Sequence, residues 1–339
     1  MKLSVLDQSA ALAGRSEAES IRETLALAAH CEVLGYHRFW LSEHHNLAAI
    51  VGSAPEVLMA AIAATTQRIR IGSAGVMLPH YSALKVAEQF RVLEALAPGR
   101  IDLGLGRAPG GDMRTAQALN PNAHAAADDF PQQVHDLQAW VNAEGQPHRG
   151  IHAHPHGPTS PEMWILGSSD YGAQLAAHFG LPYAFAYFFT DGQGAEQALD
   201  LYRRLYKPSP RHPTPQPTLC VWALAADTEA QARHHALSRD RWRVDRQRGV
   251  FGPLQSPDAV AAQGFVESDR ATLNVMHRKA FVGSAAQVGA QLRALADAMQ
   301  LDELVVNTWA HDPEVRRHSY ALLAREFALA SAGSSPPCS

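Results

Sequence analysis

Short β-branched or aromatic runs alternate eight times with longer Ala/Leu-rich stretches at helical spacing along this chain. Such alternation is typical of parallel strands joined by crossover helices. The predicted strands cover residues 3–7, 37–41, 69–76, 101–105, 163–167, 183–186, 218–226 and 303–307. Eight units without an interdomain linker favour an α/β fold of the closed (β/α)8 barrel type, a TIM barrel, and leave a doubly wound sheet as the alternative.

Several predicted helices have local signals at their ends. The clearest helical stretches are residues 17–34, 55–66, 82–96, 169–179, 228–244, 285–299 and 313–330. Pro55 suits a first helical turn, where its missing N–H would be unpaired, and Ser284 suits an N-cap. Gly35 and Gly180 each follow an apolar helix, where a left-handed C-cap is favoured.

A length of 339 residues exceeds the ~250 that a barrel commonly needs. We expect one barrel domain over residues 1–330 and a flexible Gly/Ser/Pro-rich tail over 331–339. The surplus length is assigned to insertions near 106–125, 145–161 and 246–282, which we expect at the C-terminal rim, where they would select the substrate.

Charge and cysteine content exclude several classes of protein. A formal net charge of −4 argues against a nucleic-acid binder, which normally carries a basic excess. Three scattered cysteines, Cys31, Cys220 and Cys338, fit neither a disulfide framework nor a zinc site. No signal-like segment and no uninterrupted apolar run of ~20 residues is found, so we expect a cytoplasmic protein without membrane contact.

The residues after each predicted strand are where a barrel places its chemistry. Glu43, His44, His45 and Asn46 follow the second strand and form the densest polar group in the chain. Consecutive side chains at a strand end point in opposite directions, so only one histidine can face the barrel mouth. We favour acid/base catalysis by that histidine over a purely structural role for the two histidines. A metal site is disfavoured, because no further ligands converge from the other strand ends.

Two other strand ends could hold an anion. Gly106 and Arg107 lie in a glycine-rich stretch that does not open directly into a helix, so a dinucleotide fingerprint is disfavoured. Glycine would let the backbone approach a flat ligand while Arg107 contacts a phosphate; a plain turn with a surface arginine is the alternative. Ser168 and Ser169 open a helix whose free N–H groups could hold the same phosphate, unless Ser169 is simply an N-cap.

Three further features have simpler interpretations. The alternating His152, His154 and His156 lie among prolines and indicate an irregular loop rather than a metal site. The basic cluster 239–248 is interpreted as a solvated helix face, able to approach a ligand only if the neighbouring insertion closes over the mouth. The aromatic run 183–189 is mostly core, with Tyr187 or Phe188 able to wall a flat ring.

Segments in this order and spacing resemble the bacterial luciferase-like flavin monooxygenases, most of all their non-luminescent branch. The resemblance rests on segments 36–46, 69–79, 85–89, 98–107, 166–171 and 176–182, and spans nearly the whole chain. It implies a (β/α)8 barrel that binds FMN at the strand C-terminal ends and forms a homodimer through its second and third helices. His44 matches the family's catalytic histidine, whereas His45 and Glu88 match positions near the subunit contact.

The same resemblance implies a set of cofactor-binding positions. Ala74 and Gly75 match the flavin-facing segment in which the family often has a cis peptide bond, and Arg107, Ser168 and Ser169 match the phosphate-binding positions. Gly106 stands near the flavin ring where luciferases proper have a cysteine, which argues against light emission.

The resulting hypothesis is an FMN-dependent monooxygenase that uses reduced FMN and O₂ to oxygenate a small organic substrate. No pyridine-nucleotide motif is found, so a separate NAD(P)H:flavin reductase would supply the reduced FMN. The alternatives are a deazaflavin-dependent oxidoreductase on the same barrel, a non-catalytic flavin-binding protein and a metal-dependent barrel hydrolase. No metal ligand is assigned.

Overall fold

A closed barrel of parallel strands forms the centre of the computed structural model, which describes residues 1–144 and 147–330, without the side chain of residue 124. Each barrel strand pairs with two neighbours, and the last returns to the first. The predicted (β/α)8 barrel is therefore confirmed, and the predicted tail 331–339 lies outside the described residues. The barrel strands are β1 (Lys2–Asp7), β2 (Arg38–Leu41), β3 (Arg70–Met77), β4 (Ile101–Gly106), β5 (Glu162–Gly167), β6 (Tyr183–Phe185), β7 (Pro217–Ala226) and β9 (Glu303–Asn307).

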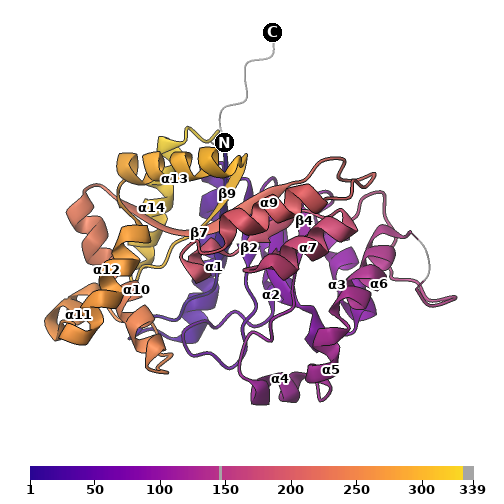
Figure 1. Cartoon of the computed structure of the whole chain (residues 1–339), viewed down its shortest axis with the longest axis horizontal. Helices are drawn as coiled ribbons and strands as arrows, with labels where there is room; N and C mark the ends of the chain where they lie inside the picture. Colours follow the sequence, from indigo (N-terminus) through magenta and orange to yellow (C-terminus); the bar gives the residue numbers. More distant parts are fainter. Residues whose placement is uncertain (145–146, 331–339) are drawn as a thin grey trace, which may run out of the picture.

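Helices surround these strands, with α4 and α5 at the lower edge of Figure 1 and α10 to α12 at its left. The longer helices are α1 (Glu17–Leu34), α2 (Pro55–Thr65), α3 (Ala83–Leu96), α6 (Phe130–Asn142), α7 (Asp170–Phe179), α9 (Ala195–Leu205), α10 (Glu229–Gln247), α13 (Ala285–Met299) and α14 (Pro313–Glu326). The shorter ones are α4 (Met113–Leu119), α5 (Ala123–Asp128), α8 (Tyr187–Thr190), α11 (Pro257–Gln263), α12 (Arg270–Lys279) and the 3₁₀ turns Leu78–His80 and Glu267–Asp269. Among the described helices, none is long and apolar enough to cross a membrane.

The predicted helix ends match the observed caps. Ser284 accepts a hydrogen bond from the backbone N–H of Gln287 and forms a capping box with it, so α13 begins where predicted. Pro55 is the first residue of α2. Gly35 and Gly180 both adopt left-handed conformations, with φ of 84° and 62°, and end α1 and α7.

The insertions differ from the prediction in two respects. No strand is predicted in the insertion 246–282, but Phe281–Ser284 form a ninth strand, β8, which pairs with Ala223–Ala226 at the end of β7. The described residues 147–161 do not lie at the C-terminal rim, because they lead from α6 into the N-terminal end of β5. Arg91, near the end of α3, donates a hydrogen bond of 2.7 Å to the Pro155 carbonyl and fastens the segment there.

The inside of the barrel is filled by side chains, as small barrels require. A buried apolar cluster is formed there by Leu6, Trp40, Trp164, Ala184, Cys220 and Val305. Ala74, Leu166 and Phe188 pack against it while remaining partly exposed. Since Ala74, Leu166 and Phe188 lie late in or after their strands, this packed interior forms a floor beneath the C-terminal mouth.

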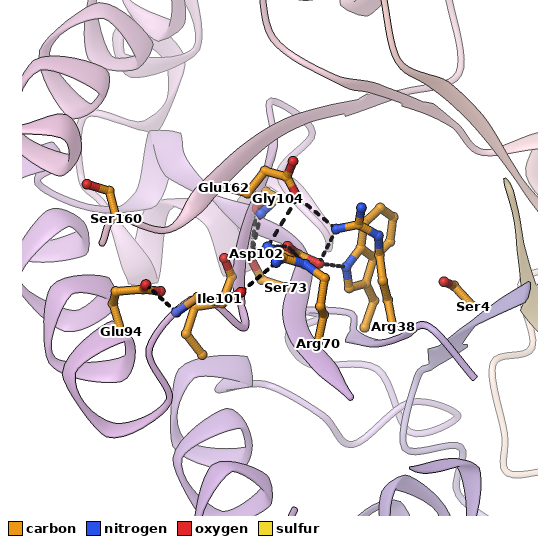
Figure 2. A network of polar contacts seen from close by, with 12 residues as sticks. Ser4, Arg38, Arg70, Ser73, Glu94, Ile101, Asp102, Gly104, Ser160 and Glu162 are labelled. Carbon is orange, nitrogen blue, oxygen red and sulfur yellow. Dashed lines mark hydrogen bonds and ion pairs between the residues drawn. The ribbon is translucent and has the colours of Figure 1, made fainter. Parts of the chain in front are cut away.

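The opposite, N-terminal end of the barrel is closed by a network of ion pairs (Figure 2). Arg38 at the start of β2 contacts Asp102 at 2.9 Å, Glu162 at 2.8 Å and Glu303 at 3.1 Å. Arg70 joins the same network, with its Nε 2.9 Å from Asp102. These charges come from five strands, so they tie the strand starts together on the side away from the mouth.

Candidate active site

Glu43 organises the polar group after β2. Its buried carboxylate accepts hydrogen bonds from the Met77 backbone N–H at 3.1 Å and the Tyr81 hydroxyl at 2.7 Å. Nε2 of His45 lies 2.7 Å from the same carboxylate, which can only accept, so Nε2 carries a proton. His45 is thereby held towards Tyr81 and His80.

His44 lies in a different environment from His45. Its Nδ1 is 3.2 Å from the Ser42 hydroxyl, and Nε2 has no protein partner among the described residues. Burial is the main cause that lowers the His44 pKa from 6.5 to about 4; positive charge on His45 and Arg246 adds to it, and Glu43 opposes it. His44 is therefore a neutral imidazole near pH 7, able to accept or donate a proton at Nε2.

The ends of β3 and β4 are shaped by small residues. The Ala74–Gly75 peptide bond is cis, as the resemblance predicts. A Cβ on Gly75 would lie 2.6 Å from the Gly104 carbonyl oxygen, so only glycine fits there. A Cβ on Gly106 would meet only the Val76 carbonyl, at 3.9 Å, so open space adjoins Gly106.

Arg107 and the start of α7 form a group of hydrogen-bond donors. The Arg107 guanidinium lies 4.0 Å from the ring centroid of Tyr171, in the first turn of α7. It makes no ion pair within residues 1–144 and 147–330. Ser169 precedes α7 with an extended backbone, but its side chain caps no backbone N–H. The arginine, the serine hydroxyl and the first N–H groups of α7 are thus available to an anion.

The predicted site residues come from consecutive neighbours in the barrel. β2 leads towards His44, β3 carries Ala74 and Gly75, β4 leads into Arg107, and β5 leads into Ser168 and Ser169. These four strands pair in that order. All the candidates therefore line one side of the same C-terminal mouth, with Arg107 and the start of α7 at one end and His44 at the other.

The prediction that the basic cluster is a solvated helix face is wrong for its first member. Arg239 is only 7% exposed, and its guanidinium stacks on Trp222 of β7 at 3.7 Å from the ring centroid. Arg243 and Arg246 follow one and two turns later on the same face of α10. This spacing could have indicated that the three arginines share one face of the helix, since residues at i, i+4 and i+7 lie on the same side.

The model for the luciferase-like monooxygenase family matches residues 1–300. The chain belongs to the luciferase-like monooxygenase family. A protein of Escherichia coli K12 named luciferase-like monooxygenase is 40% identical over 319 residues, which are 94% of this chain and 95% of the relative. The N-acetyl-S-alkylcysteine monooxygenase of Bacillus subtilis is 35% identical over 330 residues, 96% of this chain and 97% of the relative.

Solved structures agree with the family assignment. The crystal structure of apo-MsnO8 is 36% identical, with a TM-score of 0.88 over 97% of this chain and 99% of that one. Two more distant structures share the fold: the FMN complex of the oxygenating constituent of 3,6-diketocamphane monooxygenase from Pseudomonas putida, and an F420-dependent secondary alcohol dehydrogenase. The first has a TM-score of 0.70 at 19% identity and covers 96% of this chain and 97% of its own. The second has a TM-score of 0.65 at 13% identity and covers 97% of this chain and 99% of its own.

Proposed function

We propose that this chain is an FMN-dependent monooxygenase, which uses reduced FMN and O₂ to oxygenate a small organic substrate. The observation that carries the proposal is the Arg107 group, a guanidinium stacked on Tyr171 beside the uncapped start of α7. The family supports an oxygenase, and the anion site supports a flavin that ends in a phosphate.

The residues at the mouth fit FMN. Arg107, the Ser168 and Ser169 hydroxyls and the first N–H groups of α7 would hold the phosphate, since an arginine fork and a helix N-terminus both favour an anion. The Ala74–Gly75 segment and the open space beside Gly106 would accept the flat ring system. Because no side chain protrudes from Gly75 or Gly106, the backbone can approach a planar ligand closely.

His44 would hold or move a proton beside the reacting atoms. When bound, reduced flavin supplies two electrons to O₂, so that one oxygen atom enters the substrate and the other leaves as water. The low His44 pKa keeps its imidazole neutral, and the bond to Ser42 orients the ring. Its unpaired Nε2 would then exchange a proton with oxygen or substrate.

Apolar walls would keep water from the reaction. Ile50, Trp222, Leu254 and Trp309 belong to one buried cluster, and Phe188 packs against both this cluster and the barrel floor. Ile50 and Trp309 lie after β2 and β9, and Trp222 lies in the second half of β7, so these residues would enclose the mouth. A site shielded in this way limits unproductive reaction of activated oxygen with water.

A separate NAD(P)H:flavin reductase is the proposed source of reduced FMN, since the sequence contains no recognisable pyridine-nucleotide motif. Cys31 and Cys220 are free, buried thiols. Their state fits the cytoplasm, where reductants maintain thiols and reduced flavin can be supplied.

Replacement of Arg107 by Gln should weaken FMN binding about 10- to 100-fold, because charge-assisted hydrogen bonds contribute roughly 1.5–3 kcal/mol. Riboflavin lacks the phosphate, so it should bind R107Q and the wild type equally. Fluorescence titration of each flavin measures both effects. The exposed Arg114 on α4 offers a matched control, and R114Q should bind FMN normally.

The same titration distinguishes FMN from the alternative cofactor, a deazaflavin. The proposal requires wild-type protein to bind FMN more tightly than the deazaflavin F420. Tighter binding of F420, or equal loss of FMN and riboflavin in R107Q, would instead point to a deazaflavin-dependent oxidoreductase or to a different phosphate position.

A homodimer through α2 and α3 is part of the proposal. Both helices expose apolar side chains, with Val57 63% and Leu96 59% exposed. Leu96→Glu should raise the dimer dissociation constant about tenfold or more, as expected for a charge placed in an apolar contact. Sedimentation velocity measures this, and Val275→Glu on α12 is the exposed control. A wild-type chain that sediments as a monomer contradicts the expected dimer.

A further inference from the structure

A shallow hollow opens beside the mouth, between α8, β7, α10, α12 and β8. Its lining includes the aromatic side chains of Phe188, Trp222 and Phe281, the cations Arg239 and Lys279, and the carboxylate of Asp191. Phe188 also packs against the barrel floor that includes Ala74, so the hollow adjoins the segment proposed to face the flavin ring. The hollow is much smaller than a whole small-molecule site, so it suits one end of a ligand.

Arg239 is the unusual group in this hollow. It is 7% exposed, and the face of Trp222 fixes the plane of its guanidinium. No carboxylate lies within ion-pair distance of it, and it forms no hydrogen bond, within the described parts of the chain. Buried charges are normally paired, because desolvation of an ion without a partner is costly. Desolvation, followed by repulsion from Arg243, lowers the Arg239 pKa to about 9.

The neighbouring carboxylates are already engaged. Arg243 binds Asp191 through both guanidinium nitrogens, at 2.8 and 2.6 Å. Asp240 lies 2.6 Å from Nε2 of His277. Lys279 adds a second cation at the rim of the hollow and makes no ion pair in the described residues. The hollow therefore carries an unbalanced positive charge.

We infer that the hollow binds the carboxylate of an organic-acid substrate, with Arg239 as the bidentate contact and Lys279 as the second cation. A guanidinium held flat against an indole presents its N–H fork in one direction, which matches a planar carboxylate. The apolar remainder of the acid would extend past Phe188 towards the mouth. This inference rests on the proposed function, since it names the substrate class of the same site.

Isothermal titration calorimetry with two probes tests the inference. 3-Phenylpropionate and 3-phenylpropionamide have nearly the same shape and differ in charge at one end. The FMN-loaded protein should bind the acid about tenfold or more tightly than the amide, the factor that one charge-assisted hydrogen bond supplies. Arg239→Gln should abolish this preference and leave FMN affinity unchanged.

Arg233 provides the matched control on α10. It is exposed and paired with Glu229, so R233Q should keep the preference for the acid. Should R239Q fail to fold, Lys279→Gln at the exposed rim should reduce the preference by a smaller factor. Equal binding of acid and amide, binding of neither, or an R239Q that retains the preference would overturn the inference. An R239Q that loses FMN instead would assign Arg239 to the flavin and also overturn it.

Repeating the titrations without FMN separates this inference from the proposed function. Protein that prefers the acid but binds no FMN would refute the proposed function and retain the carboxylate site. Protein that binds FMN normally but shows no preference for the acid would refute the carboxylate site alone.

Discussion

His44→Asn should slow the reoxidation of enzyme-bound reduced FMN by O₂ about 10²- to 10⁴-fold, the range typical of a lost general acid or base. Asparagine retains hydrogen bonding but cannot exchange the proton that Nε2 of His44 would carry. FMN affinity should stay unchanged, because the proposed phosphate donors, Arg107, Ser168 and Ser169, lie at the ends of β4 and β5. Stopped-flow mixing with O₂, followed by flavin absorbance, measures the rate.

His135→Asn is the control, since His135 is an exposed histidine on α6. It should leave reoxidation unchanged. If H44N reoxidises flavin and oxygenates substrate at the wild-type rate, the chain is better explained as a non-catalytic flavin-binding protein.

The same rate should be insensitive to pH around 6.5. Burial lowers the His44 pKa to about 4, so the neutral, proton-accepting form is fully present above pH ~5 and is lost only as pH falls through about 4. If the wild-type rate changes with pH near 6.5 and this change disappears in H44N, His44 titrates near neutral pH, which would contradict this role.

The positions of the site residues at strand ends could be predicted, because a strand pattern is a local feature of the sequence and the geometry of a barrel is the same in all barrels. A β-branched run predicts where a strand ends, and parallel strands place their C-terminal ends at one mouth. Those two steps were enough to bring His44, Ala74, Arg107 and Ser168 to one edge. The catalytic and cofactor roles of these residues stay predictions, which the experiments above test.

The burial of Arg239 could not be predicted from charge alone. A run of arginines on a helix is usually solvated, and only the packing of α10 on β7 places Trp222 against the guanidinium. The strand β8 was missed for a similar reason, since its four residues pair only with the extension of β7, far away in sequence. The prediction for residues 147–161 was wrong although chain order could have corrected it, because a segment that directly precedes a strand lies at the N-terminal end of that strand.

Asp102→Asn should lower the free energy of unfolding by about 3–5 kcal/mol, because it removes the fully buried carboxylate that pairs with both Arg38 and Arg70 and leaves part of their charge uncompensated. Asp102 is fully buried and accepts hydrogen bonds from Arg38, Arg70 and the Trp40 indole, at 2.9, 2.9 and 2.8 Å. Asparagine keeps the shape but removes the negative charge. Urea denaturation measures the change, and Asp200→Asn, in an exposed pair with Arg204, should cost less than about 1 kcal/mol.

The same ion-pair network should make the stability of the protein depend on pH in the acid range. Burial alone would raise the Asp102 pKa, but Arg38 and Arg70 outweigh it and hold that pKa below its usual 3.8. The stabilisation is therefore fully present above the unfolded pKa and is lost as pH falls through the folded one. D102N has no such carboxylate to protonate, so its stability should fall less steeply on acidification than that of the wild type.

FMN affinity of folded D102N should be normal, because the network closes the end of the barrel opposite the mouth. A D102N protein as stable as the wild type would show that the remaining partners of Arg38, Glu162 and Glu303, compensate for the lost charge.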